Sequence, residues 1–408
     1  MKFNKWTVGL AAVGVVSFAS AARADEQMSQ VQTALTQTTL SGYVDTAMQW
    51  NPGTDANAAT GGVPGAHIPG YSFAKDDGFS LNAIDIALDR PEDSSAWAAG
   101  YHVELMAGSS AVGVPLSSSA GDTISGLTVR QAFIRLHTPV GGNGIDWQIG
   151  VFDSVIGYES NSDPLNPNYT RSYGYTIEPT TLTGIMGTYK VNDEVSFSGG
   201  IANTPGGLGV ITPSFTSTTQ YESQKTYFGT VSLTAPDSFG WLKGASLSAG
   251  VIHGSDSWAA GNGTTTSLYV GATVPTPITQ LKVGFSFDYL FEPNIGGTGP
   301  NEGYDLWNLA GYATYQATDK LSFNARAEIL SDDTAGPGLA DTDEVVYPAH
   351  RAEEFTLDVQ YNLWANVITR GEFRWDHVED GDAFGASPDG DSMKKNDFLL
   401  ALNVIYQF

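Results

Sequence analysis

Charged side chains of both signs occupy alternate positions in two segments of the C-terminal half, LSFNARAEIL and VITRGEFRWD. Alternate residues of a β-strand share one face, so each segment predicts a strand with a charged face and an apolar face. Such a charged face could orient ions in a water-filled passage, and the solvated face of an ordinary sheet is the alternative. The charged positions are Arg326 and Glu328 in the first segment and Arg370, Glu372, Arg374 and Asp376 in the second.

Two other segments extend the charged face. EFTLDVQYNLW places Asp358 and Gln360 opposite a row of apolar residues, and LTVRQAFIRLH contains Arg130 and Arg135. These two arginines are an odd number of residues apart, so a regular strand cannot turn both to the same side. If the apolar faces of these strands lie against a membrane and the charged faces enclose a channel, we expect Arg135 to face the channel beside Gln131. Arg130 would then lie near a membrane interface or past the strand end. A β-bulge would also turn Arg130 inward.

The sequence offers little support for catalysis or metal binding. It contains no G-x-S-x-G elbow, no H-E-x-x-H pair and no G-x-x-x-x-G-K-[ST] phosphate loop. His377 next to Asp376 is the only tempting acid–base cluster, and a hydrogen-bonded surface histidine is the commoner explanation. The acid-rich stretches SDDTAGPGLADTDEVV and VEDGDAFGASPDGDS lack the EF-hand spacing, so we interpret them as a solvated acidic rim. We predict no catalytic residue, no metal site and no cofactor.

The composition narrows the class of protein. The 408 residues carry a formal net charge of -25, with 44 acids against 19 Lys and Arg, and include no cysteine. Nucleic acid is an unsuitable partner, because affinity for phosphate requires clustered Lys and Arg. Without disulfides an exported chain must be stabilised by hydrogen bonding and packing, which suits a large sheet.

The first residues predict export. Lys2 and Lys5 precede a short apolar run, and the A-x-A pattern ends at Ala24, as in a secretory signal peptide cleaved there. The apolar run is shorter than the ~20 residues of a spanning helix. We therefore expect a signal peptide at 1–24 and a short periplasmic segment at 25–38.

From residue 39 onward, segments that alternate between apolar and polar residues recur, as in QLKVGFSFDYLFEP. Many reach the ~10 residues that cross a bilayer as a tilted strand. The connections between them alternate between long and short, which is typical of a barrel with long extracellular loops and short periplasmic turns. Counting the connections predicts an all-β, antiparallel, up-and-down transmembrane β-barrel of about 16 strands over residues 39–408.

The last segment, DFLLALNVIYQF, places apolar residues at every second position up to Phe408. Lipid would cover that row in an outer-membrane barrel, whereas a second protein layer would cover it in a soluble sheet. The main expectation is an outer-membrane channel. Two alternatives remain open, an outer-membrane barrel enzyme of the protease or lipase type and a secreted β-rich binding or adhesion protein.

Three stretches carry a resemblance to a known family. They are LSGYVDTAMQW, GVFDSVIGYESNSDPLNPNYTRSYGYTIEPTTLTG and VITRGEFRWDHVED. They resemble the OmpL-like putative beta-barrel porins of the bacterial outer membrane, and the likeness extends over most of the chain after the signal peptide. The resemblance implies a barrel that lets small hydrophilic solutes or ions cross the outer membrane of a Gram-negative-type bacterium.

The resemblance also implies roles for particular residues. In porins the third external loop often folds into the barrel, so the loop at 154–180 is expected to narrow the channel, with its charged residues opposite the arginines. The last strand resembles the signal read by the outer-membrane assembly machinery, and a homotrimer is one open oligomeric state. The expected constriction residues are Glu159, Asp163, Arg171 and Glu178, and the expected assembly signal is Val404, Tyr406 and Phe408.

Overall fold

The computed structural model describes residues 31–32, 38–52, 75, 77–112, 114–115, 126–203, 224–255, 264–292, 304–332, 351–379, 384–386 and 392–408. The signal peptide with its cleavage position Ala24, most of segment 25–38 and most of the two acid-rich stretches lie outside these residues. Strands account for most of the described chain. They are β1 (Val31–Gln32), β2 (Thr39–Trp50), β3 (Gly78–Arg90), β4 (Ala98–Ala107), β5 (Val114–Pro115), β6 (Leu127–Thr138), β7 (Ile145–Asp153), β8 (Thr181–Lys190), β9 (Val195–Asn203), β10 (Lys225–Thr234), β11 (Ser246–Ser255), β12 (Thr264–Pro275), β13 (Leu281–Glu292), β14 (Tyr304–Gln316), β15 (Leu321–Asp332), β16 (Arg351–Trp364), β17 (Val367–Val378), β18 (Phe384–Ala386), β19 (Ser392–Lys394) and β20 (Asn396–Gln407).

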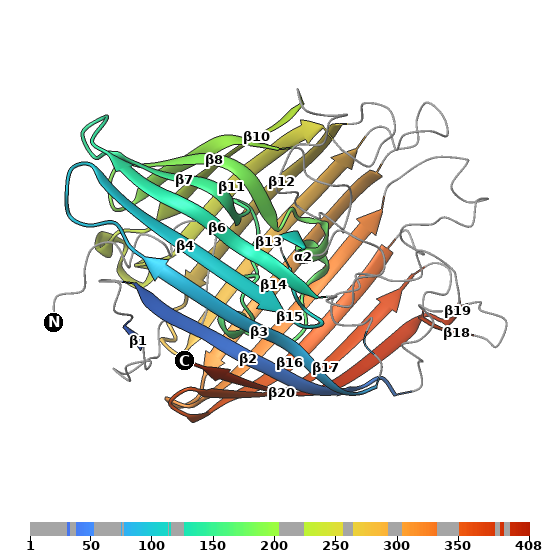
Figure 1. Ribbon diagram of the computed structural model, residues 1–408. Helices are drawn as coiled ribbons and strands as arrows, with labels where there is room; N and C mark the ends of the chain where they lie inside the picture. The colour runs from blue at the N-terminus through green and yellow to red at the C-terminus, as the bar shows by residue number, and fades with distance from the viewer. Residues whose placement is uncertain are drawn as a thin grey trace.

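Sixteen of these strands form a closed antiparallel barrel (Figure 1). Each long strand pairs with its neighbours in the sequence, and β20 pairs with both β17 and β2, so the sheet has no free edge at this seam. The Phe408 amide donates to the Gly42 carbonyl at 3.0 Å, and the Gly42 amide returns a bond of 3.1 Å. The short strands β1 and β5 add to the sheet, and β18 pairs with β19 separately. The predicted fold class and strand number are confirmed.

The short connections lie at the end of the barrel where β2 begins (Figure 1). They are 91–97, 139–144, 191–194, 235–245, 276–280, 317–320 and 365–366. The alternation in length fails once, because 235–245 holds the 3-10 helix η5 (Asp237–Leu242) and exceeds the opposite connection 256–263. The up-and-down topology, rather than length alone, therefore fixes the end at which each connection lies.

The period of two separates the two faces of the wall. On β20 the outward side chains are exposed, with Leu402 at 60% and Phe398 at 39%, while Leu399 and Asn403 on the inner face are at 0% and 1%. No described helix is long and apolar enough to span a bilayer. The exposed apolar side chains of the strands form a band on the outer face, as a transmembrane barrel requires.

A charge on that outer face should be costly. Leu357, exposed at the middle of β16, is expected to cost about 2–4 kcal/mol as Leu357→Arg, because the guanidinium would lie near the bilayer midplane. Gln148→Arg, on the inner face of β7, is the matched control and should cost less. Urea unfolding in lipid vesicles measures both, and equal costs would contradict the assignment of faces.

Arg130 corrects one expectation. It lies neither at a membrane interface nor past the strand end, because it is 4% exposed and its Nε lies 3.0 Å from Glu104. The register of β4 against β6 shifts at this point, since Glu104 faces Gln131 while Leu105 faces Val129. Arg130 is the extra residue of this β-bulge, which turns it inward together with Arg135.

Candidate functional site

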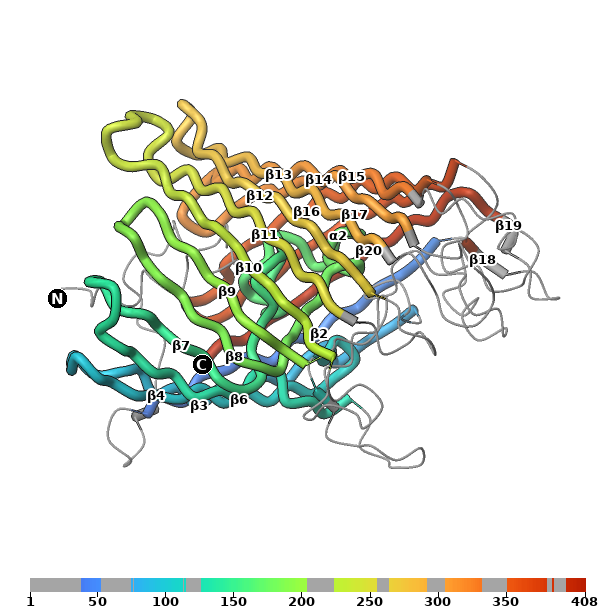
Figure 2. Tube along the Cα trace, turned by 90° about the horizontal axis from the view of Figure 1, so that it is seen from above, coloured from blue at the N-terminus to red at the C-terminus, as the bar shows by residue number. Residues whose placement is uncertain are grey.

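The connection between β7 and β8, residues 154–180, lies inside the barrel. It contains the 3-10 helix η4 (Asp163–Leu165) and the short helix α2 (Tyr173–Ile177). Both views place α2 within the ring of strands, close to β13, β14 and β15 (Figures 1 and 2). Ser172 caps the helix by accepting a hydrogen bond from the Tyr175 amide. We call residues 154–180 the inner loop.

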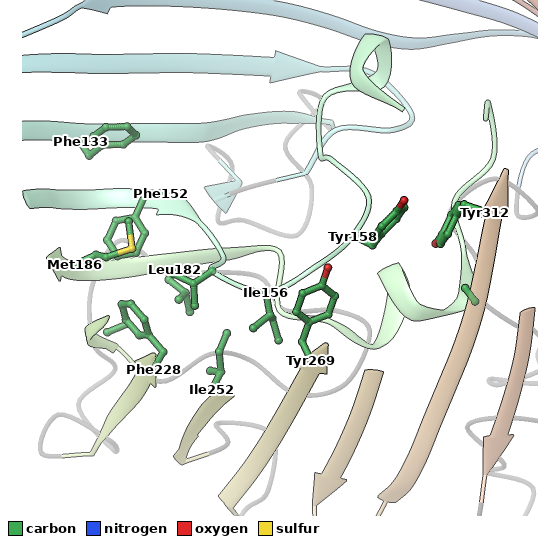
Figure 3. Packing of buried hydrophobic residues seen from close by; sticks show 13 residues of the cluster. Phe133, Phe152, Ile156, Tyr158, Leu182, Met186, Phe228, Ile252, Tyr269 and Tyr312 are labelled. Atoms are coloured by element: carbon green, nitrogen blue, oxygen red, sulfur yellow. The ribbon is translucent and has the colours of Figure 1, made fainter. Parts of the chain in front are cut away.

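The first residues of the inner loop pack on an apolar part of the inner wall (Figure 3). Ile156 reaches Gly250 of β11, where an added Cβ would lie 2.7 Å from its methyl group. Tyr158 stacks on Tyr312 of β14 with ring centroids 4.2 Å apart. The lumen is therefore not uniformly polar, because this apolar cluster fixes the start of the inner loop. Its other members come from β6, β7, β8, β9, β10, β11, β12 and β14 and from the loop, namely Phe133, Phe152, Val155, Leu182, Met186, Ala202, Phe228, Ile252, Tyr269 and Ala310.

Arg326 of β15 holds the middle of the inner loop. Its NH1 donates to the Thr170 carbonyl at 2.8 Å and to Glu159 Oε1 at 2.9 Å, and its NH2 donates to the Arg171 carbonyl at 3.0 Å. Its Nε donates to Glu354 at 3.1 Å on the neighbouring strand. The guanidinium thus uses several of its donors in one fixed arrangement.

Two arginines of β17 make similar contacts. Arg374 NH1 donates to the Arg171 carbonyl at 2.5 Å, and its NH2 pairs with Asp376 at 2.8 Å. Arg370 NH2 donates to the Asn166 carbonyl at 2.5 Å. The arginines therefore bind main-chain oxygens of the loop, which every residue type supplies.

Acids of the same wall accept from the loop. Glu372 accepts from the amides of Tyr169 at 2.6 Å and Thr170 at 3.0 Å, and Glu328 accepts from the Tyr173 amide at 2.8 Å. The Tyr173 hydroxyl donates to Asp376 at 2.5 Å. Interleaved charge of both signs thus supplies partners for both the amides and the carbonyls of the irregular loop backbone.

The expectation is that the charged residues of the loop stand at a constriction opposite the arginines, whereas the arginines lie against the loop and bond mainly to its main-chain oxygens. Arg326, Arg370 and Arg374 are 0%, 3% and 1% exposed and lie directly beneath the loop. Of the remaining predicted wall residues, Asp358 accepts from Asn324 at 3.2 Å and Gln360 accepts from Arg370 at 3.1 Å. The loop covers this part of the wall.

The four predicted loop residues do not gather at one point. Glu159 pairs with Arg326, while Asp163 pairs with Arg171 at 2.6 Å within the loop. Glu178 lies at the loop's return to β8, and burial together with the carboxylate of Asp288 raises the pKa of Glu178 well above its ordinary value. The loop thus carries a buried carboxyl group at its return to β8 and two ion pairs nearer its middle.

Gly157 allows the two ends of the inner loop to meet. Its φ is +121°, and an added Cβ would lie 2.5 Å from Glu178 Oε2. Gly157→Ala should therefore destabilise the protein by about 1–3 kcal/mol through backbone strain. Gly311→Ala is the matched control, because its nearest neighbour would be 3.9 Å away. Thermal unfolding in detergent compares the two, and equal melting temperatures would contradict the tight closure.

A second set of ionic contacts lies on the inner faces of β3, β4 and β6. Arg135 donates to Asp89 at 2.6 Å, as expected for an inward residue. The sequence analysis missed Asp89, His102 and Glu104, which contact one another on this wall. His102 and Glu104 are two residues apart on β4 and so share one face of the strand. This spacing was the sequence feature that could have indicated the ionic contacts.

Comparison with known proteins identifies one family and several solved structures with a similar fold. The family described as Putative beta-barrel porin-2, OmpL-like, matches residues 37–408. No curated protein matches the chain. The outer membrane channel DcaP of Acinetobacter baumannii is similar with a TM-score of 0.61 and 13% identity, covering 91% of this chain and 97% of that one.

Two other solved structures share the barrel. An anion-selective porin from Comamonas acidovorans has a TM-score of 0.55 and 13% identity, covering 91% of this chain and 99% of that one. The in-vitro folded OmpT of Vibrio cholerae, described as a trimer form, has the same TM-score of 0.55 and identity of 13%, and the same coverage of 91% and 99%. At such identity these structures support the fold alone.

Proposed function

The chain belongs to the Putative beta-barrel porin-2, OmpL-like, family, and we propose that it forms a water-filled outer-membrane channel for passive diffusion of small hydrophilic solutes or ions. The inner loop narrows this channel. The observation that carries the proposal is a closed sixteen-strand barrel, apolar outside, with a hydrogen-bonded loop held in its interior. Because the inner loop occupies part of the barrel interior, the barrel is expected to hold a restricted passage rather than an open one.

The wall residues divide into two groups under this proposal. The charged residues of β15 and β17 anchor the inner loop and so set the shape of the passage. Arg135, whose side chain is 11% exposed, belongs to the group in contact with lumen water. The anchoring group consists of Arg326, Glu328, Arg370, Glu372, Arg374 and Asp376.

Liposome swelling tests the proposal. Proteoliposomes containing the purified protein should swell in small sugars and amino acids, at a rate that falls steeply with solute size. Empty liposomes carried through the same reconstitution are the control. Equal swelling rates with and without protein would refute passive diffusion. Hydrolysis of a lipid or peptide substrate without solute flux would instead favour the enzyme alternative.

Export and assembly are part of the same proposal. We infer cleavage after Ala24, insertion into outer-membrane lipid, and recognition of Val404, Tyr406 and Phe408 by the assembly machinery. A homotrimer is the proposed oligomer, supported by the trimer form described for the Vibrio cholerae relative in fold. The exported protein's mass tests the cleavage position, and cross-linking in membranes tests the trimer.

The last residue should affect assembly strongly. Phe408 both ends the outward row of β20 and closes the barrel through its backbone bonds with Gly42. Phe408→Ala keeps those backbone bonds, so a fall in the folded amount in outer membranes would come from lost recognition of the side chain. Leu400→Ala, on the same face, is the control. Equal amounts of both variants would contradict the role.

A further inference from the structure

His102 of β4 lies between two carboxylates on the inner wall. Its Nδ1 is 2.9 Å from Asp89 Oδ1, and its Nε2 is 3.1 Å from Glu104 Oε2. Arg135 pairs with Asp89 at 2.6 Å, and Arg130 pairs with Glu104 at 3.0 Å. We call these five residues the histidine network. It lies apart from the residues that anchor the inner loop.

The hydrogen-bonding capacity of these groups limits the charge of His102. An ionised carboxylate only accepts, and a neutral imidazole has one N–H donor and one lone pair. With both ring nitrogens at hydrogen-bond distance from carboxylates, a neutral ring would point a lone pair at an acceptor. An imidazolium donates at both positions. The geometry therefore favours a positively charged His102.

The neighbouring residues favour ionised carboxylates rather than a proton moved onto one of them. Arg135 donates to Asp89, and both Arg130 and Gln131 contact Glu104, Gln131 at 2.9 Å. Charge-assisted hydrogen bonds of this kind stabilise the charged form of the acid. The proton consequently resides on the imidazole.

The ring is also fixed in place and reaches the lumen. The His102 ring stacks on the Phe133 ring with centroids 5.3 Å apart, and the Arg135 guanidinium lies 5.2 Å from the centroid of the Phe133 ring. The side chain of His102 is 14% exposed and that of Asp89 is 29% exposed. Ions in the lumen water can therefore sense the charge of this network.

The charge balance of this wall depends on His102. Around the network the ionised acids are Asp89, Glu104 and Asp153, which pairs with Arg130 at 2.6 Å, whereas Asp85 hydrogen-bonds to Glu104 and so must carry the proton that joins the two carboxyl groups. Against these three negative charges stand Arg130 and Arg135, and His102 when it is charged. A neutral residue at position 102 would leave this wall with one uncompensated negative charge.

We propose that His102, held as an imidazolium between Asp89 and Glu104, determines ion selectivity in this channel by reducing the preference of the wall for cations. The proposal rests on the channel function proposed above. Its chemistry is electrostatic, since a fixed charge in a narrow passage raises the concentration of counter-ions and lowers that of co-ions. The ligands concerned are small inorganic ions and charged solutes of similar size.

Reversal potentials test the proposal with His102→Gln, which keeps hydrogen bonding at this position and removes the charge. In a KCl gradient across a planar bilayer at pH 7, the variant should show a K⁺ to Cl⁻ permeability ratio raised by about twofold or more, from one unit charge acting on an ion ~8 Å away. His253→Gln is the control, because His253 lies on the outer face of β11 and bonds Thr266 at 2.8 Å. Identical ratios in the His102 variant and the unmodified protein would overturn the proposal.

Nitrogen-15 NMR of histidine-labelled protein in lipid nanodiscs provides a second measurement that does not depend on conduction. The signals missing from His102→Gln identify His102, and both of its ring nitrogens should be protonated at pH 7. A ring with one protonated nitrogen would overturn the proposal even if the channel conducts. Failure to record any channel would instead refute the proposed function, while the NMR spectrum still decides the charge of His102.

Discussion

Shortening the inner loop will raise single-channel conductance severalfold. Replacing residues 160–176 by a short glycine–serine linker removes the segment that crosses the lumen, and conductance grows with the open cross-section. The ends can be joined without strain, because the Ser154 amide donates to the Thr180 carbonyl at 3.0 Å and Gly157 lies against Glu178. Planar-bilayer recording in concentrated KCl measures the change.

Leu165→Ser provides the control for that variant. Leu165 lies in the same loop, its side chain is 37% exposed, and its replacement leaves every anchoring contact in place. Its conductance should equal that of the unmodified protein. A shortened loop with unchanged conductance would mean that residues 160–176 do not limit the passage.

Arg326→Met should be the most damaging single substitution in the wall. It leaves Glu159, Glu328 and Glu354 buried without their shared cation and removes donors to the carbonyls of Thr170 and Arg171. Breaking a buried ion pair from one side costs about 3–5 kcal/mol. Equilibrium unfolding by urea in lipid vesicles measures this loss of folding free energy.

Two further variants show how much of the stability lost in Arg326→Met comes from the unbalanced buried charge. Arg326→Met combined with Glu354→Gln should recover part of the lost stability, because it removes the charge of one of the three carboxylates that lose Arg326, leaving Arg374 3.8 Å from the side chain at position 354. Lys243→Met breaks an ion pair at the surface, where the side chains of Lys243 and Asp237 are 61% and 82% exposed, and should cost within about 1 kcal/mol. Similar costs for Lys243→Met and Arg326→Met would show that Arg326 is not a structural anchor.

The strands were predictable because one physical requirement repeats along them. Lipid favours apolar side chains at the outward positions, so Phe285, Phe287 and Leu402 mark the outer face without any knowledge of their neighbours. Closure followed from the same pattern, since an edge cannot remain unpaired in a bilayer. The sixteen strands were therefore readable from local sequence.

The site was only partly predictable because its contacts join distant residues. The inward parity of Arg326 and Arg374 was evident, but their partners are backbone carbonyls of Thr170 and Arg171, which carry no pattern in the sequence. Arg130 turned inward through a bulge that shifts the register by one residue. His102 gains its role only when β3 and β6 bring acids and arginines beside β4.

Single-channel recording of the unmodified protein with and without non-electrolyte polymers tests the central claim most directly. A water-filled barrel narrowed from within should produce discrete current steps that small polymers reduce and large polymers leave unchanged. Insertion into the bilayer without any current, at every voltage and polymer size, would contradict the account.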